Sequence, residues 1–130
     1  MIRTRSLPQR YATALSNGRQ EVFADAPIEK GGGGAGLGAH ELLEAALAVC
    51  INMTVRMHAD QHKVPLSSVT TRVSIQRPDG HTVRFDYGIE LSGPLSAAQR
   101  EELEAAARAC PVRQTLSKHL EFRAVAEQNA

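Results

Sequence analysis

Residues 40–62, HELLEAALAVCINMTVRMHADQH, form the longest and most strongly helical stretch of the sequence, with Cys50 in its middle. Apolar residues recur at helical spacing along it, and positions 45–51 are apolar without interruption. This pattern predicts a core helix that is buried nearly all round. The uninterrupted apolar run is far shorter than the roughly 20 residues that span a bilayer. Because Glu44 also ends the run on one side, we expect no insertion into a membrane.

The ends of this helix are marked by its flanking residues. Gly38 precedes it, and glycine is a tolerated N-cap. Pro65 disfavours helical geometry at Val64, so the helix should end near His62 or Lys63.

Composition points to one globular domain, residues 1–130. The chain has 130 residues, of which 42% are hydrophobic, enough for a core without disulfide bonds. Its 15 basic and 14 acidic residues are not clustered, which argues against nucleic acid as a partner. The first ten residues, MIRTRSLPQR, are not followed by the apolar region of a secretory signal, so we expect a cytoplasmic protein.

The segment before the core helix predicts a hairpin and a glycine-rich loop. Residues 11–16 and 21–26 are typical of strands, and the Asn17-Gly18 pair between them is a strong hairpin signal that places Arg19 at or just past the turn. Residues 31–38, GGGGAGLG, should form a mobile or unusually tight connection. Some of these glycines have dinucleotide-fingerprint spacing, but no buried strand precedes them, so a plain loop is favoured.

The segment after the core helix predicts a second hairpin, two helices and a last strand. Apolar and polar residues alternate over positions 69–75 and 83–91, on either side of a Pro-Asp-Gly turn. Ser96 and Gln99 have the spacing of a capping box that starts a helix, and Pro111 should end it. Cys110 is then the candidate N-cap of a short helix from Pro111 to about His119. Residues 120–124 have the pattern of a final strand, followed by a polar tail.

The two cysteines, Cys50 and Cys110, are the candidates for chemistry. In a reducing compartment, cysteines are more often free, catalytic or redox-active than structural. Cys110 has a predicted helix start, whose amides favour a thiolate, whereas Cys50 lies mid-helix and would need a guanidinium or similar group from elsewhere. Taken alone, each is more often a small buried hydrophobe. The pair is chemically informative only if the two thiols meet.

Two motifs carry a resemblance to a known family. The segments ELLEAALAVC, ending at Cys50, and ARACPV, around Cys110, resemble the OsmC/Ohr family of osmotically induced and organic hydroperoxide resistance proteins. The order of the first hairpin, the glycine-rich loop, the helix and the second hairpin matches as well. The resemblance covers about the whole chain.

The resemblance implies an α+β fold in which a long central helix packs with antiparallel sheets in an intertwined homodimer. Active sites would lie at the dimer interface. Cys50 would attack an organic hydroperoxide and become a sulfenic acid, and Cys110 would resolve it to a disulfide, which captures the sulfenic acid before over-oxidation. A lipoyl-type dithiol would be the reductant, and no metal or organic cofactor is implied.

Two further site residues are expected from the resemblance. Arg19 fits the place of the family's active-site arginine. The family's functional glutamate usually lies ten positions before the first cysteine, where this chain has His40. Glu41, nine positions before Cys50, matches a second OsmC-like branch. On one straight helix Glu41 would be roughly 13 Å from Cys50, so it could act through Arg19 or in the partner subunit's site.

Two alternative functions compete with a thiol peroxidase. His58 and His62 have the i, i+4 spacing of paired metal-binding imidazoles, but no zinc-protease glutamate follows His58, and a solvated helix end explains both residues. We therefore predict no metal site. The second alternative is an OsmC-like dimer without appreciable peroxidase activity, which binds a small apolar ligand in the interface cleft.

Overall fold

The computed structural model describes residues 1–126, which form two compact units. The first unit consists of Met1–Ala48 and Arg72–Gly88, and the second of Val49–Thr71 and the chain from Ile89 onward. One helix and two strands contribute residues to both units. The single-domain assignment stays a prediction.

A three-stranded antiparallel sheet forms the N-terminal part of the first unit. Its order is β1 (Arg3–Ser6), β2 (Thr13–Ser16) and β3 (Glu21–Ala24). The β2–β3 hairpin confirms the predicted one. Strand β1 was missed by the sequence analysis, because its four residues are polar and exposed and therefore carry no apolar alternation.

The turn between β2 and β3 is closed by Asn17. Its Oδ1 accepts the backbone N–H of Arg19 at 2.9 Å and of Gln20 at 2.8 Å. Gly18 and Arg19 are thus the central residues, and Gly18 has φ +92°, a conformation that favours glycine. The prediction that Arg19 lies at the turn is confirmed.

The glycine-rich loop is tight and is organised around Asp25, a buried carboxylate. Asp25 Oδ1 accepts the N–H of Ala26, and Oδ2 accepts those of Gly33 at 3.1 Å and Ala35 at 3.2 Å. A Cβ at Gly32 would collide with the carbonyl of Ala26. The loop therefore needs glycine for close backbone approach rather than for mobility.

Asp25→Ala should destabilise the chain by about 2–3 kcal/mol, because three backbone N–H groups lose their acceptor in a part-buried setting. Urea unfolding followed by circular dichroism measures this loss. Asp79→Ala is the matched control, since Asp79 accepts hydrogen bonds from His81 and Thr82 in an exposed turn. Equal unfolding midpoints for the two variants would contradict the role given to Asp25.

The long helix α1 (Ala39–Gln61) begins and ends close to the predicted residues. Gly38 is its N-cap, since the Gly38 carbonyl accepts the N–H of Leu42 at 3.0 Å. Its C-terminus closes through the Val64 N–H, which donates to the Ala59 carbonyl at 2.8 Å. Lys63 lies between them with φ +54°, as in a left-handed helix cap.

Helix α1 is buried on one face within the second unit. Ile51, Val55 and Ala59 are each 0% exposed, and each of the two larger side chains contributes about 1.5–3 kcal/mol of burial. The expectation that the helix is buried nearly all round is wrong for the single chain. Met53 and Met57, on its other face, are 54% and 58% exposed.

Among residues 1–126, α1 alone is long and apolar enough, by length and composition, to cross a membrane. The uninterrupted apolar run counted from the sequence is therefore shorter than the stretch of α1 whose average composition is apolar enough to cross a membrane. Its polar residues are nevertheless bonded to neighbouring segments: Asn52 donates to the carbonyl of Val69, and Arg56 donates to that of Leu66. These contacts tie α1 to β4 (Ser68–Gln76) and to the segment that precedes it.

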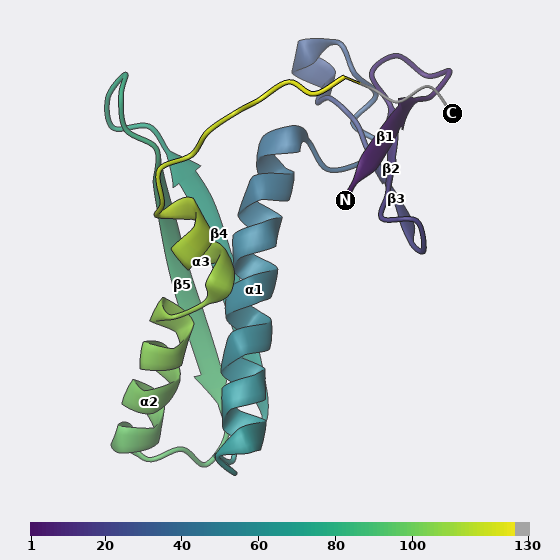
Figure 1. The fold of residues 1–130 in the computed structure, drawn as a ribbon. Helices are drawn as coiled ribbons and strands as arrows, with labels where there is room; N and C mark the ends of the chain where they lie inside the picture. The colour runs from purple at the N-terminus through teal and green to yellow at the C-terminus, as the bar shows by residue number, and fades with distance from the viewer. Residues whose placement is uncertain (127–130) are drawn as a thin grey trace. The chain divides into compact units, whose positions relative to one another are not determined.

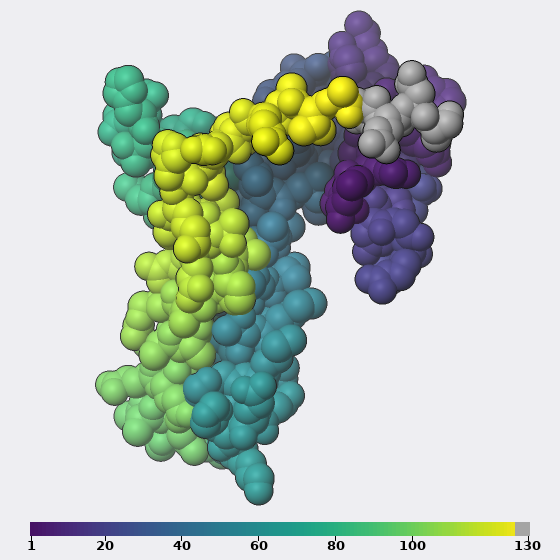
Figure 2. All heavy atoms as spheres, in the orientation of Figure 1, coloured from purple at the N-terminus to yellow at the C-terminus, as the bar shows by residue number. Residues whose placement is uncertain are grey.

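The remaining elements follow the predicted order β4 (Ser68–Gln76), β5 (Arg84–Ser92), α2 (Ala97–Arg108) and α3 (Pro111–Leu116). Strands β4 and β5 form a two-stranded sheet (Figure 1). The capping box of α2 is present as predicted, with Ser96 Oγ accepting the Gln99 N–H and Gln99 Oε1 accepting the Ser96 N–H. Figure 2 shows α2 and α3, in lime to yellow, packed beside the C-terminal half of α1, in teal.

The predicted last strand is wrong. Residues 119–126 form no strand, and Leu120 and Phe122 are 50% and 93% exposed. An alternating pattern makes a strand only when a neighbouring strand offers its N–H and C=O groups, and no described strand pairs with this segment. The end of the predicted polar tail, residues 127–130, lies outside the described residues.

Candidate functional site

The second unit brings the two cysteines together. Cys50 lies in α1 and Cys110 is the N-cap of α3, so the chain that separates them folds back to place α3 beside α1. The backbone N–H of Val112, in α3, donates to Cys50 Sγ at 3.4 Å. Both thiols are free. The two thiols are therefore neighbours, which the sequence analysis required for the pair to be chemically informative.

Cys110 is the more enclosed of the two thiols. It is 0% exposed, and its Sγ accepts the N–H of Arg113 at 3.4 Å, as an N-cap side chain does. Burial raises the pKa of the Cys110 thiol, and the neighbouring Cys50 raises it further. Cys110 is therefore held in its protonated form to higher pH than an ordinary cysteine.

Cys50 is partly exposed and has two polar neighbours. Besides the Val112 N–H, the hydroxyl of Thr54 lies 4.0 Å from its sulfur, one helical turn away. The sequence analysis assigned neither residue to the site. Thr54 could have been found from its i, i+4 spacing, whereas the Val112 amide acts through its backbone and leaves no residue-type signal.

Arg19 and Glu41, the other predicted site residues, belong to the first unit. Arg19 is exposed in the β2–β3 turn. Glu41 lies in the first turn of α1, where its Oε1 accepts the backbone N–H of Gly38 at 3.0 Å. Glu41 thus has a structural role as part of the helix cap. His40 is exposed beside it.

The first unit also contains a cavity of about 680 Å³. Its lining is largely apolar but includes the charged residues Asp25, Lys30 and Glu41, together with His40. Apolar lining residues come from the segment before β1, from β2, from the end of β3 and the loop after it, and from the start of α1: Ile2, Leu15, Ala24, Pro27, Ala39 and Leu42. The volume is within the range of small-molecule sites.

The family is decided by a match to the model of the OsmC-like protein family over residues 31–124. The chain belongs to the OsmC-like family. The match includes α1 with Cys50 and the start of α3 with Cys110. No curated protein sequence matches this OsmC-like chain.

Solved structures show the same fold at low sequence identity. An OsmC-like protein from Mycoplasma pneumoniae has TM-score 0.73 and 20% identity, covering 89% of this chain and 85% of its own. An organic hydroperoxide resistance protein OsmC from Legionella pneumophila has TM-score 0.63 and 21% identity, covering 90% and 88%. The organic hydroperoxide resistance protein OhrB of Bacillus subtilis has TM-score 0.57 and 19% identity, covering 90% and 89%. The α+β OsmC-like fold expected from the sequence is confirmed.

Proposed function

We propose that this OsmC-like protein is a cysteine-based peroxidase that reduces organic hydroperoxides. The observation that supports this most is the pairing of a partly exposed Cys50 with a buried Cys110 across α1 and α3. An exposed thiol can meet a peroxide, and an adjacent buried thiol can then capture the product. The names of two structural neighbours, organic hydroperoxide resistance proteins, agree with this substrate class.

The proposed reaction has three steps. The Cys50 thiolate attacks the terminal oxygen of the hydroperoxide, the O–O bond breaks, and the alcohol leaves after taking up a proton. Cys50 is then a sulfenic acid, which the Cys110 thiol attacks; a disulfide forms and water leaves. A lipoyl-type dithiol finally reduces this disulfide and is itself oxidised to a disulfide.

The surroundings of the two thiols support this division of roles. The Cys110 pKa is raised, so Cys110 is not the thiol that ionises readily near neutral pH. Cys50 has an amide donor and a route to solvent. Attack on peroxide needs access to the sulfur, and Cys50 is the more exposed of the two thiols.

Turnover of cumene hydroperoxide, t-butyl hydroperoxide and hydrogen peroxide with dihydrolipoamide as reductant tests this function. We expect faster reduction of the two organic substrates than of hydrogen peroxide. Loss of both thiols as disulfide should accompany each single turnover when the dithiol is left out. Thiols that persist in excess cumene hydroperoxide would exclude the proposed peroxidase.

Arg19→Ala should slow oxidation of Cys50 by roughly ten-fold or more, because we propose that the Arg19 guanidinium favours the Cys50 thiolate. One charge-assisted hydrogen bond of about 1.5–3 kcal/mol corresponds to a change of this size. Stopped-flow oxidation across pH, in a Cys110→Ser background, reports Cys50 alone. The thiolate fraction at neutral pH should fall together with the rate.

Arg10→Ala is the matched control for Arg19→Ala, since Arg10 is an exposed arginine of the same unit that lies over the Tyr11 ring. It should leave the rate and its pH profile unchanged. If Arg19→Ala behaves like Arg10→Ala, another cation must activate Cys50, and His40 is the next candidate.

The proposal includes a homodimer. The exposed face of α1 presents Val49, Met53 and Met57 in succession, each about half exposed. Successive large apolar side chains on one helix face are typical of an interface. A second copy of α1 would cover them, and the proposed active sites would then form at the interface, with Glu41 able to serve its partner's site. We also expect the protein to be cytoplasmic.

A second candidate function is supported by the cavity of the first unit. Its volume and apolar lining suit a small apolar ligand, and this function would need no chemistry at the cysteines. In that case cumene hydroperoxide would not consume the thiols at a substrate-limited rate, while an apolar fluorescent probe would bind. The thiol titration above separates the two functions.

A further inference from the structure

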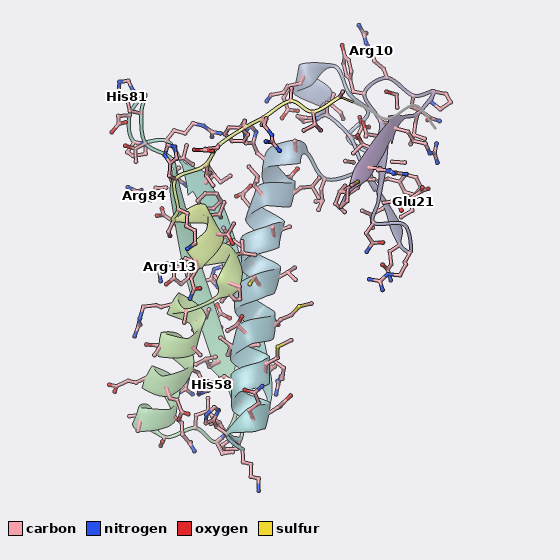
Figure 3. All side chains as sticks on the ribbon, viewed as in Figure 1. Arg10, Glu21, His58, His81, Arg84 and Arg113 are labelled. Carbon is pink, nitrogen blue, oxygen red and sulfur yellow. The ribbon has the colours of Figure 1, made fainter. Side chains whose placement is uncertain are left out.

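Three metal-ligating side chains gather in the second unit. His58 and His62 come from the end of α1, and Glu102 comes from α2. One ligand atom from each lies within 4.8 Å of those of the other two. Figure 3 shows His58 on the side of α1 that faces α2. The sequence offered only the histidine pair, and the fold adds the carboxylate that was missing.

The contacts of the two histidines suit metal binding. His62 Nδ1 lies 3.0 Å from the backbone carbonyl of His58. A carbonyl can only accept, so Nδ1 carries the proton, and the Nε2 of the neutral ring keeps its lone pair. Metal-binding histidines are commonly held in their tautomer by such a carbonyl. The two rings are stacked, with centroids 4.0 Å apart, so they are presented together.

The side chains of Glu102 and His58 are already in contact. His58 Nε2 lies 2.8 Å from Glu102 Oε1, and the two side chains are 27% and 39% exposed. Ligands of a tetrahedral Zn²⁺ at bond lengths near 2.0–2.1 Å lie about 3.3 Å from one another. His58 Nε2 and Glu102 Oε1 are joined by a hydrogen bond, whose proton a metal ion would replace as the two atoms move apart to this distance. A gap of 4.8 Å needs an approach of about 1.5 Å from partly exposed side chains.

We propose that His58, His62 and Glu102 form a binding site for a divalent transition-metal ion such as Zn²⁺. Transition-metal ions such as Zn²⁺ bind well to imidazole nitrogens together with a carboxylate, whereas Mg²⁺ and Ca²⁺ prefer sites made of oxygen ligands alone. A carboxylate supplies charge to the ion, and the fourth coordination position is open to water. This site is independent of the cysteine chemistry proposed above.

Zinc titration by calorimetry tests the site, using the Cys50→Ser, Cys110→Ser double variant so that thiols cannot bind the ion. We expect one Zn²⁺ per chain. His58→Ala or His62→Ala should weaken binding by about 100-fold, and Glu102→Gln, which keeps a hydrogen-bonding oxygen, by about ten-fold. His81→Ala is the control, since His81 lies in the β4–β5 turn outside the cluster, and it should leave binding unchanged.

Cobalt binding to the unaltered protein gives a second readout that does not depend on the double variant folding. The visible spectrum of a site of nitrogen and oxygen ligands lacks the thiolate-to-metal charge-transfer band. Absence of stoichiometric zinc binding, or binding that survives both histidine substitutions, would overturn the proposal. A cobalt spectrum dominated by thiolate ligation would also overturn it.

Discussion

Cys50→Ser should reduce hydroperoxide turnover to the level of the buffer, because a serine hydroxyl cannot replace the thiolate as nucleophile at neutral pH. Cys110→Ser should behave differently: Cys50 still reacts once with hydroperoxide, but no buried thiol is available to resolve the sulfenic acid. Mass spectrometry after one equivalent of hydroperoxide should then find Cys50 as sulfenic acid and, with more oxidant, as over-oxidised acid.

The two variants also test which thiol reacts first. Cys110 is 0% exposed with a raised pKa, so an assignment in which it attacks the peroxide predicts the opposite pattern. Circular dichroism and sedimentation confirm that each variant keeps its fold and assembly. Normal turnover by Cys50→Ser would exclude Cys50 as the attacking residue, and single oxidation confined to Cys110 would reverse the roles.

Met53→Lys should weaken the proposed homodimer by about a thousand-fold. In a symmetric interface each substitution occurs twice, and placing unpaired charges in an apolar contact costs several kcal/mol. About 4 kcal/mol in the dimer free energy corresponds to nearly three decades in the dissociation constant. Met53 is the test position because it lies in the middle of the exposed apolar face, between Val49 and Met57.

Sedimentation velocity over a range of micromolar concentrations measures this change. The matched control is Ala105→Lys, which places the same charge at an exposed position of α2. The unaltered protein and the control should sediment as dimers, with no folded monomer. A stable, active monomer of the unaltered protein would remove the shared interface altogether.

The features that could be predicted from the sequence are those specified within a few residues. The capping box of α2 depends on Ser96 and Gln99 alone, and the start of α3 depends on Cys110 followed by Pro111. Both were predicted at the correct residues. Helix α3 nevertheless ends at Leu116 rather than near His119, since no strong stop signal fixes its last turn.

Features that depend on distant partners could not be predicted in the same way. Strand β1 forms because β2 pairs with its polar residues, while the alternating segment at residues 120–124 finds no described strand to pair with. The Val112 amide reaches Cys50 across 62 positions of sequence. The family resemblance named both cysteines, but only the fold shows what surrounds each sulfur.

The expected burial of α1 is also limited by what a sequence pattern can say about partners. Apolar residues all round a helix indicate how much surface must be covered, but they do not say by which chain. One face of α1, with Ile51 and Val55, is covered within the second unit. The face with Met53 is left exposed in the single chain, and the proposed homodimer would cover it.

In the first turn of α3, the protection of two backbone amides from hydrogen exchange depends on the chemical state of the two cysteine sulfurs. The N–H of Val112 donates to Cys50 Sγ, and the N–H of Arg113 donates to Cys110 Sγ. Disulfide formation brings the two sulfurs to about 2.05 Å and so changes the position of both acceptors, which should weaken the hydrogen bonds of two successive amides at once. Hydrogen exchange at residues 112 and 113 should therefore speed up on oxidation and slow again on reduction. The backbone of α3 would then report the redox cycle without any label.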